Sequence, residues 1–580
     1  MFSVMRSIRN IVSALGSYSK YVRWAYLVAV FEGFTIFIPY MLFFYTVDKY
    51  LKQTLHTGDF YIVLAVMLAS VLIRAVLRRM MDKLQQDKGY YAFAEHRLKL
   101  ADHLARLNMG YYSESNIGNM TGVITTDITF IEEAAMMQLA IAVSNIASVI
   151  PTTLMMFLYD YRLGAVYLFF LVLALLSLRF LLRKMEKNAR TRQDHQAALS
   201  QEVLTYVRGI QTIKAFNLGD EKTNEIDRMI TRVRDGSLKF IFDMTLPSQL
   251  TSLSLSVPVA FIIALVTYYV LAGSMTAATG IGMMTFAFIL YVPINLLLTS
   301  SEMLELGDAS INRYRELMST ETLKDCVDNP FRPSKMEIEF KHVHFAYEDK
   351  EVLKDINLKI RANTFTALVG RSGSGKTTIA NLIARFWDVE KGEIIFDGVN
   401  IKDISYENLL ENISMVFQRV YLFHDTIYNN IAFGKSDVSR EDVIEAAKKA
   451  RCHDFIMKLE NGYDTVVGEG GSTLSGGEKQ RISIARAILK DAPLILLDEA
   501  TAGIDPENEK YIQEAIDELV KNKTLVVIAH RLATIRNADN IVYLDKGRIV
   551  EQGTHEELIA MDGMYKKQHD FYLKNLEGDL

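Results

Sequence analysis

The residues in this sequence with the clearest chemical meaning form a glycine-rich run that ends in lysine and threonine. Glycines let a loop bend so that successive backbone N–H groups face an anion, and a following helix adds its dipole. A lysine here reaches the β- and γ-phosphates of a nucleotide, and the threonine hydroxyl is a ligand for Mg²⁺. An ordinary glycine turn is the alternative, but the flanking residues favour a strand before the run and a helix after it. The pattern predicts binding of a nucleoside triphosphate by Gly370, Ser372, Gly373, Ser374, Gly375, Lys376, Thr377 and Thr378.

Two carboxylates follow a short apolar run further along the chain. Residues 494–497 are Leu-Ile-Leu-Leu, and Asp498 and Glu499 come directly after them. The carboxyl ends of buried parallel strands are where ligands bind in open α/β sheets. Asp498 suits the Mg²⁺ shell because hard cations take oxygen ligands, and Glu499 is then available to polarise an attacking water. A helix cap would explain acidic residues, but not why they follow an apolar strand downstream of a phosphate loop, so we predict that Glu499 is the general base.

A helix start with two glycines forms a third feature. Ser475 and Glu478 are three residues apart, which is a capping box at the start of an amphipathic helix. Gly476 and Gly477 lie between them and leave backbone N–H groups bare, which makes a second anion site. Since the phosphate loop already covers its own nucleotide, this second site indicates a nucleotide shared with another copy of the domain.

Regular elements are expected around these residues. Residues 364–369 are β-prone and suit a buried parallel strand, and residues 379–386 read as a helix. Residues 336–345 alternate apolar and polar side chains, as a half-buried strand does. Tyr347 follows that strand, where its ring could stack on a nucleobase or simply pack.

Composition separates an apolar first half from a polar second half. The chain has 580 residues with a net charge of −5, and length alone suggests about two to four domains. The mild acidity argues against a nucleic-acid partner, which would select a basic face. Two cysteines, Cys326 and Cys452, imply no disulfide framework.

The first half of the sequence contains six apolar segments. Each is long enough, at 1.5 Å per residue, to cross or nearly cross a hydrocarbon core of about 30 Å. A buried soluble core could explain one or two such runs, but not six, so we predict a membrane domain. The segments are residues 22–47, 60–77, 134–159, 163–182, 246–271 and 281–298.

The links between these segments are uneven. Those after the second and fourth, residues 78–133 and 183–245, are long, polar, rich in Lys and Arg, and helical in periodicity. The positive-inside rule then places these links, both termini and the nucleotide-binding half in the cytoplasm of a cell-membrane protein. The turns near 109–119 and 207–219 would be the tips of long helical rods.

Glu32 is the clearest ionisable residue inside a segment. An intramembrane carboxylate is costly and faces a bundle interior or a water-filled cavity. Glu32 could therefore contact a substrate in the cavity, or make an interhelical hydrogen bond, and both possibilities stay open. Arg74 and Arg179 lie nearer the cytoplasmic ends, where we expect them to snorkel.

These motifs, in this order behind six spans, resemble the ATP-binding cassette (ABC) transporters, specifically a half-transporter of the exporter fold. The resemblance implies a multidomain membrane protein. An all-α six-helix transmembrane domain with long cytoplasmic helical extensions (1–320) would be joined by a linker (321–335) to an α/β P-loop NTPase domain, the ATP-binding cassette (336–580). It also implies roles at five further positions. Tyr347 would stack on adenine, Gln418 would contact Mg²⁺, Glu469 would lie near the coupling helices, His530 would contact the γ-phosphate, and Asp505 would belong to the D-loop.

One departure from the family pattern matters. Residues 502–504 are Ala-Gly-Ile where the family usually has Ser-Ala-Leu, so a serine hydroxyl before Asp505 is absent. Some hydrogen bonding between nucleotide domains would be lost, and we still expect a competent ATPase because Glu499, His530 and the signature are present.

The resemblance implies a dimer with a second half-transporter chain, either identical or different, in contact with membrane lipid. Each ATP, with its Mg²⁺, would lie between Lys376 and Thr377 of one chain and Ser475 and Gly477 of the other. The expected cargo is a hydrophobic or amphipathic small molecule, lipid or peptide, moved by alternating access. Importers of iron-siderophore complexes share this fold and stay an alternative, because residues 476–481, 491–493 and 505–508 resemble that group. A membrane-anchored ATP-dependent regulator is an alternative of another class, but it would need only one or two spans.

Overall fold

The computed structural model describes residues 2–112, 114–217, 219–289, 291–324, 333, 335–347, 350–435, 437–498, 506–529 and 535–578. The chain forms two compact units, which are considered separately. The first contains Met1–Ala105 and Ser115–Thr320, and the second contains Arg106–Glu114 and Glu321–Leu580. The short segment Arg106–Glu114 therefore belongs to the second unit, although the chain on either side of it belongs to the first.

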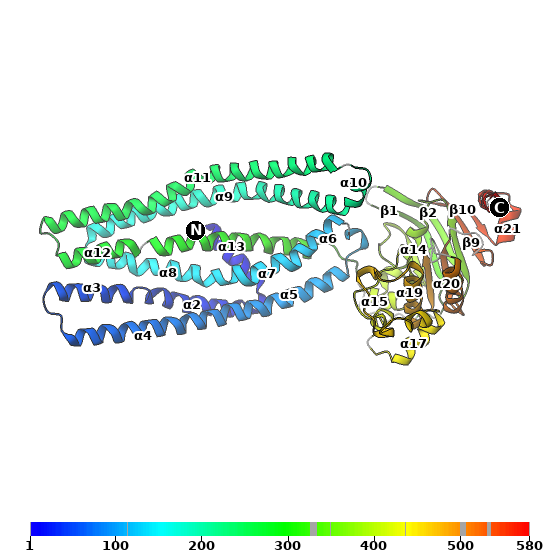
Figure 1. Cartoon of the computed structure of the whole chain (residues 1–580), viewed down its shortest axis with the longest axis horizontal. Helices are drawn as coiled ribbons and strands as arrows, with labels where there is room; N and C mark the ends of the chain where they lie inside the picture. The colour runs from blue at the N-terminus through cyan, green and yellow to red at the C-terminus, as the bar shows by residue number, and fades with distance from the viewer. Residues whose placement is uncertain are drawn as a thin grey trace. The chain divides into compact units, whose positions relative to one another are not determined.

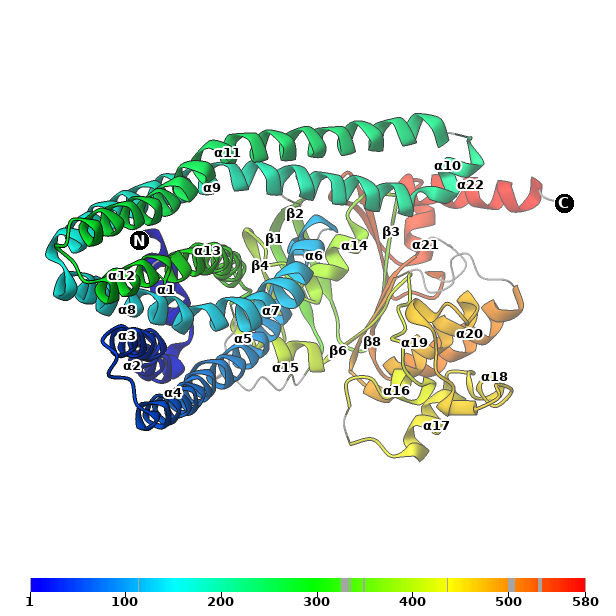
Figure 2. The ribbon, with the colours of Figure 1, turned by 60° about the vertical axis from the view of Figure 1, so that its left-hand side comes forward.

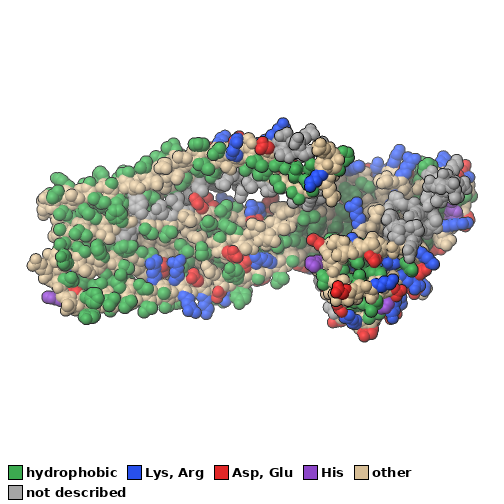
Figure 3. Space-filling view, in the orientation of Figure 1, with side chains coloured by type: hydrophobic (Ala, Val, Ile, Leu, Met, Phe, Trp, Pro, Cys, Tyr) green, Lys and Arg blue, Asp and Glu red, His purple; other side chains and the backbone are tan. Residues whose placement is uncertain are grey.

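The first unit is helical, and its described residues contain six helices long and apolar enough to cross a membrane. Many of their large apolar side chains face outward, as lipid-facing side chains do; Leu72 and Phe169 are each 66% exposed. Figure 3 shows hydrophobic side chains spread over these helices. The expected six spans are confirmed, as Gly16–Leu51, Thr57–Ala105, Asn116–Tyr159, Tyr161–Leu181, Glu225–Leu271 and Ala277–Met318.

Two of these helices are much longer than a bilayer requires. Helix α9 has 48 residues and α11 has 53, so they are about 72 and 80 Å long at 1.5 Å per residue. They lie side by side along their length (Figures 1 and 2), and both continue well beyond a hydrocarbon core. The helices of the first unit are α1 (Phe2–Ala14), α2 (Ser19–Thr35), α3 (Ile38–Leu51), α4 (Thr57–Asp82), α5 (Lys88–Ala105), α6 (Glu114–Thr121), α7 (Ile128–Phe130), α8 (Met136–Tyr159), α9 (Tyr161–Arg208), α10 (Ile210–Ala215), α11 (Gly219–Leu271), α12 (Ala277–Ile289) and α13 (Tyr291–Met318).

The connections follow the polar residues of the sequence. Asp160 forms the turn between α8 and α9, and its side chain accepts the N–H of Arg162 at 2.8 Å. In the described residues, proline interrupts the interior of α8 at Pro151 and of α11 at Pro247 and Pro258, where each removes a backbone hydrogen bond.

The described residues of the second unit form two sheets. The larger has the strand order β10-β9-β3-β8-β7-β6, and β3 pairs in parallel with both β8 and β9. The smaller sheet has the order β2-β1-β4-β5 and is antiparallel. Strands β3 and β7 are almost continuously apolar because helices cover both faces of a parallel sheet. Their bounds are β1 (Ile338–Tyr347), β2 (Lys350–Ile360), β3 (Phe365–Gly370), β4 (Lys391–Phe396), β5 (Val399–Asn400), β6 (Ile413–Val416), β7 (Leu494–Asp498), β8 (Thr524–Ile528), β9 (Asn540–Asp545) and β10 (Arg548–Gly553).

This topology brings two distant segments to one edge of the larger sheet. Only β8 separates β3 from β7, and all three run in parallel, so their carboxyl ends lie together. The glycine-rich loop follows β3, and Asp498 ends β7. The remaining helices are α14 (Lys376–Ile383), α15 (Tyr406–Glu411), α16 (Ile427–Ile431), α17 (Arg440–Lys449), α18 (His453–Ile456), α19 (Gly476–Lys490), α20 (Pro506–Leu519), α21 (His555–Ala560) and α22 (Met564–Gly578).

Candidate functional site

The glycine-rich loop has a backbone that only glycine adopts readily. Gly370, Gly373 and Gly375 have φ angles of 145°, 77° and 106°. A Cβ added to Gly370 would lie 2.1 Å from the carbonyl oxygen of Leu544 in β9, so the loop packs directly on a neighbouring strand. Helix α14 begins immediately after Gly375 and directs its N-terminus toward the loop.

Lys376 is folded into this loop. Its side chain is 5% exposed, and its ammonium donates to the carbonyl oxygens of Gly370 at 2.8 Å and Arg371 at 3.0 Å. Thr377, the next residue, is exposed in the first turn of α14. The cation and the hydroxyl thus lie next to each other at the start of one helix.

A pocket of about 920 Å³ opens over the loop, and most of the predicted phosphate-binding residues line it. This volume lies within the range of small-molecule sites, about 300–1,000 Å³. Its lining residues are Tyr347, Lys350, Glu351, Val352, Lys354, Ser372, Gly373, Ser374, Gly375, Lys376, Thr377, Thr378, Gln418 and Lys546. The structure therefore brings Tyr347 and Gln418 together with the loop, which lies far from Gln418 in sequence.

Three lysines of this pocket were not among the predicted site residues: Lys350, Lys354 and Lys546. The backbone N–H of Lys354 donates to the carbonyl oxygen of Gly547 at 2.8 Å, and the Gly547 N–H donates to the Ser374 carbonyl oxygen at 3.2 Å. These bonds join β2 and the β9–β10 turn to the phosphate loop. Only long-range pairing creates this arrangement, so no local spacing could indicate it.

Tyr347 is the last residue of β1, and its side chain contacts the first turn of α14. Its hydroxyl donates to the Thr378 hydroxyl at 3.4 Å, and its ring packs edge-on against Phe345 and Trp387. Gln418 lies just after β6. Glu499, Asp505 and His530 lie outside the described residues.

The signature residues form the predicted capping box. Ser475 caps α19: its hydroxyl accepts the N–H of Glu478, and the Glu478 carboxylate accepts the N–H of Ser475 at 2.8 Å. An added Cβ at Gly476 would meet nothing within 4 Å, whereas one at Gly477 would press on Asn508. None of the four described residues Ser475, Gly476, Gly477 and Glu478 lines the pocket over Lys376.

Comparison with known proteins matches both halves of the chain. The family described as ABC transporter transmembrane region matches residues 24–294, and the family described as ABC transporter matches residues 353–502. The chain is an ABC transporter. It is a multi-pass membrane protein that binds ATP and couples its hydrolysis to transport.

Relatives and a solved structure resemble this transporter over most of its length. The ATP-dependent lipid A-core flippase of Syntrophus aciditrophicus (strain SB) is 37% identical over 492 residues, which cover 84% of this chain and 81% of that protein. The flippase of the same name from Escherichia coli (strain K12) is 34% identical over 476 residues, 82% of each chain. The structure of a bacterial Atm1-family ABC exporter with ATP bound superposes with a TM-score of 0.84 at 26% identity, covering 96% of this chain and 98% of that one.

Glu469 of the transporter lines a second pocket of the ATPase unit, about 500 Å³ in volume. Phe423 and Phe433 form its apolar floor, with their rings stacked 4.6 Å apart. The Arg486 guanidinium lies 5.5 Å from the centre of the Phe433 ring, and burial lowers the pKa of Arg486 to about 10. The pocket thus combines aromatic rings with two carboxylates, Glu469 and Asp425.

Glu32 is paired inside the membrane unit. The Arg74 Nε donates to Glu32 Oε1 at 2.9 Å, and the Ser144 hydroxyl donates to the other carboxylate oxygen. The Glu32 side chain is 4% exposed. Gly33 permits this contact, because an added Cβ would lie 2.6 Å from the Ser144 carbonyl oxygen. The geometry supports the interhelical role for Glu32, and Arg74 bonds to Glu32 where the sequence suggested snorkelling.

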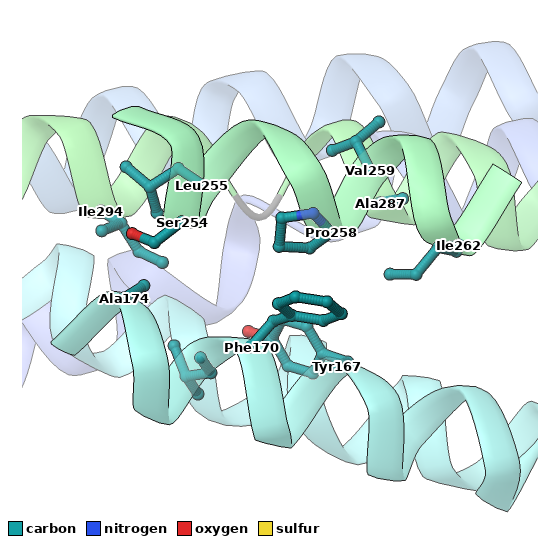
Figure 4. Close-up of a pocket in the computed structure, with 11 residues that line it drawn as sticks. Tyr167, Phe170, Ala174, Ser254, Leu255, Pro258, Val259, Ile262, Ala287 and Ile294 are labelled. Atoms are coloured by element: carbon teal, nitrogen blue, oxygen red, sulfur yellow. The ribbon is translucent and has the colours of Figure 1, made fainter. Parts of the chain in front are cut away.

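A small apolar cavity lies between α9 and α11 (Figure 4). Phe170 and Tyr167 face Pro258 across it, and its volume is about 20 Å³. That is room for roughly one water molecule, well below the size of a small-molecule site. The cavity is a packing defect beside Pro258 and is too small for a small-molecule substrate.

Proposed function

We propose that this transporter works as a dimer and moves an amphipathic lipid between the leaflets of the membrane. The observation that carries the cargo is the similarity to lipid A-core flippases, which spans both the membrane and the ATPase units. The likeness to an Atm1-family exporter over nearly the whole chain supports outward transport. An iron-siderophore complex is the competing cargo for this fold.

The position of the signature supports the dimer. Gly476 and Gly477 begin α19, where the first N–H groups of a helix have no intrahelical acceptor, and this helix start lies apart from the pocket over Lys376 of the same chain. Each ATP is then bound by Lys376 of one copy and by Ser475 and Gly477 of the other. The γ-phosphate favours the closed dimer because only a triphosphate reaches both sets of donors.

Mg²⁺ fits the residues at the edge of the larger sheet. The Thr377 hydroxyl, the Gln418 amide oxygen and the Asp498 carboxylate are oxygen donors, which Mg²⁺ prefers. We assign these three residues to the ion, which would neutralise charge on the β- and γ-phosphates. Glu499 is assigned to polarise the attacking water and His530 to contact the γ-phosphate.

Coupling and orientation complete the proposal. The pocket that Glu469 lines combines aromatic rings with carboxylates, and we assign Glu469 to the coupling of ATP hydrolysis to transport. Positive charge in the long links supports a cytoplasmic ATPase unit and cytoplasmic termini.

The experiment is ATP hydrolysis by the transporter in liposomes that carry different candidate cargoes. Lipid A should stimulate turnover several-fold over plain phospholipid, and Glu499→Gln should abolish turnover in every condition. Stimulation by a ferric siderophore instead would overturn the lipid proposal. Insensitivity to every cargo would indicate a membrane-anchored regulator.

A further inference from the structure

Three aromatic rings connect the nucleotide pocket to the frame of the ATPase unit. The Tyr347 and Trp387 rings meet edge to face, with centroids 5.1 Å apart and planes at 81°. Phe345 packs against both, at 4.9 Å from Tyr347 and 6.4 Å from Trp387. Tyr347 also lines the nucleotide pocket, so a residue of that pocket is in direct contact with the Trp387 indole.

The other side of Trp387 supports the segment Arg106–Glu114. A Cβ added to Gly110 would lie 2.9 Å from the indole Nε1 and 3.8 Å from Cδ1, so the turn and the indole are already in close contact. The N–H of Met109 donates to the carbonyl oxygen of Phe386, the residue before Trp387, at 3.0 Å. A displaced indole therefore has no free space on the side of the turn.

The frame around this contact is firmly held. Arg385 is fully buried, and its guanidinium donates to the Asp388 carboxylate at 2.9 Å and to two carbonyl oxygens, Ile404 at 3.1 Å and Lys324 at 2.7 Å. The Leu323 N–H donates to the Arg106 carbonyl oxygen at 2.9 Å. Both the indole and the turn are thus anchored to the same body.

We propose that Trp387 is a positioning residue that transmits occupancy of the base site from Tyr347 to the turn at Gly110. The proposal rests on the proposed role of Tyr347 in stacking on adenine. A base on Tyr347 competes with the edge contacts and with the Thr378 bond that now hold the ring, and the indole follows. Because the turn continues into α5 on one side and α6 on the other, its displacement acts on two helices of the membrane unit.

This signal depends on the base and is separate from dimer closure, which needs the γ-phosphate. ADP carries the base without the γ-phosphate, and inorganic tripolyphosphate carries three phosphates without a base. The two probes therefore separate the Trp387 contact from phosphate binding. A merely structural tryptophan would not distinguish them.

The sequence makes the measurement direct because the chain has two tryptophans, Trp24 and Trp387. In the full-length Trp24→Phe variant in nanodiscs, Trp387 is the sole indole fluorophore. ADP should change its emission, while tripolyphosphate, at a concentration that inhibits ATP hydrolysis by competition, should leave the emission unchanged. Equal responses to both probes, or no response to ADP, would overturn the proposal.

A matched glycine pair tests the other end of the contact. Gly110→Ala presses a methyl group onto the indole, whereas Gly118→Ala meets nothing within 4 Å. A coupling of ordinary size predicts that Gly110→Ala shifts KM for ATP by about 5-fold, with kcat nearly unchanged, and that Gly118→Ala shifts neither. Identical KM values in both variants would overturn the proposed role of Trp387. The proposed function would still stand in that case, provided that ATP turnover is normal. An inactive parent protein would overturn both.

Discussion

The ammonium of Lys376 lies 2.8 Å from the carbonyl oxygen of Gly370, the residue that begins the same loop. A second carbonyl oxygen, that of Arg371, accepts from the same ammonium at 3.0 Å. Two neutral carbonyl oxygens therefore hold the lysine within the loop. When a triphosphate binds, its negatively charged oxygens would take their place as acceptors. Charge-assisted hydrogen bonds are about twice as strong as neutral ones, so the exchange favours binding.

Replacing this lysine should remove the central phosphate contact. We expect Lys376→Met to lower ATP turnover by about 100-fold or more, the cost of losing one preorganised electrostatic contact. Phosphate release from the transporter in nanodiscs measures it. Lys435→Met is the matched control, since Lys435 also donates to a carbonyl oxygen at 2.8 Å, that of Leu489, and lies outside the nucleotide pocket. Equal losses in both variants would contradict the assignment.

The signature cap should have two separable effects. Ser475→Ala removes a helix cap, which costs about 1 kcal/mol of stability. Thr554 caps α21 with the same capping box, so Thr554→Ala should cost a similar amount. Only Ser475→Ala should also reduce ATP turnover, because only that helix start is proposed to contact the partner's nucleotide. Thermal unfolding and phosphate release on the two variants compare these effects, and equal turnover would reject the signature's role.

The pair of Glu32 and Arg74 should contribute to stability and leave transport intact. The Glu32 carboxylate is buried and the Arg74 guanidinium is half-exposed. Glu32→Gln should therefore lower the free energy of unfolding by about 2 kcal/mol, a loss between those expected for an exposed and a fully buried ion pair. Lys52→Met, which breaks the exposed pair with Asp48, should cost under about 0.5 kcal/mol. Melting temperatures in detergent measure both losses. Transport that is lost in a well-folded Glu32→Gln protein would show that Glu32 contacts substrate.

The cluster of His555, Tyr565 and His569 predicts a pH dependence. Burial, with smaller contributions from His569 and Arg536, lowers the pKa of His555 from its usual 6.5. The folded state thus binds the proton less well than the unfolded state, and this stabilisation is complete above pH 6.5 and lost as the pH falls below it. The melting temperature of the His555→Gln variant should fall by about 1–2 °C less than that of the parent between pH 7.5 and 5.5. The effect is small because His555 is only partly buried, so solvent screens its charge. Identical slopes for parent and variant would contradict this cause.

Local patterns predicted the parts of the molecule that local physics determines. Glycine spacing predicted the loop at Lys376, the capping box predicted the start of α19, and apolar lengths predicted six spans. Contacts between distant segments had no such signal. Lys546 reaches the nucleotide pocket because β9 pairs with β3. Gly110 contacts Trp387 because the segment Arg106–Glu114 packs in the second unit, whereas the chain on either side of it belongs to the first unit.

The same limit explains Arg74. The position of Arg74 near the cytoplasmic end of its segment favoured snorkelling to the interface. Instead, its guanidinium donates to the Glu32 carboxylate on another helix. A burial partner 42 positions away cannot be inferred from the periodicity of either helix alone.

The most direct test of the central claim is lipid movement itself. The transporter is reconstituted in liposomes with fluorescent lipid A in both leaflets, and dithionite then quenches the label that faces the outside. When ATP is added outside to ATPase units that face outward, wild-type protein should protect a growing fraction of the label, and Glu499→Gln should not. Wild-type protein that hydrolyses ATP in these liposomes while the protected fraction stays constant would contradict lipid transport.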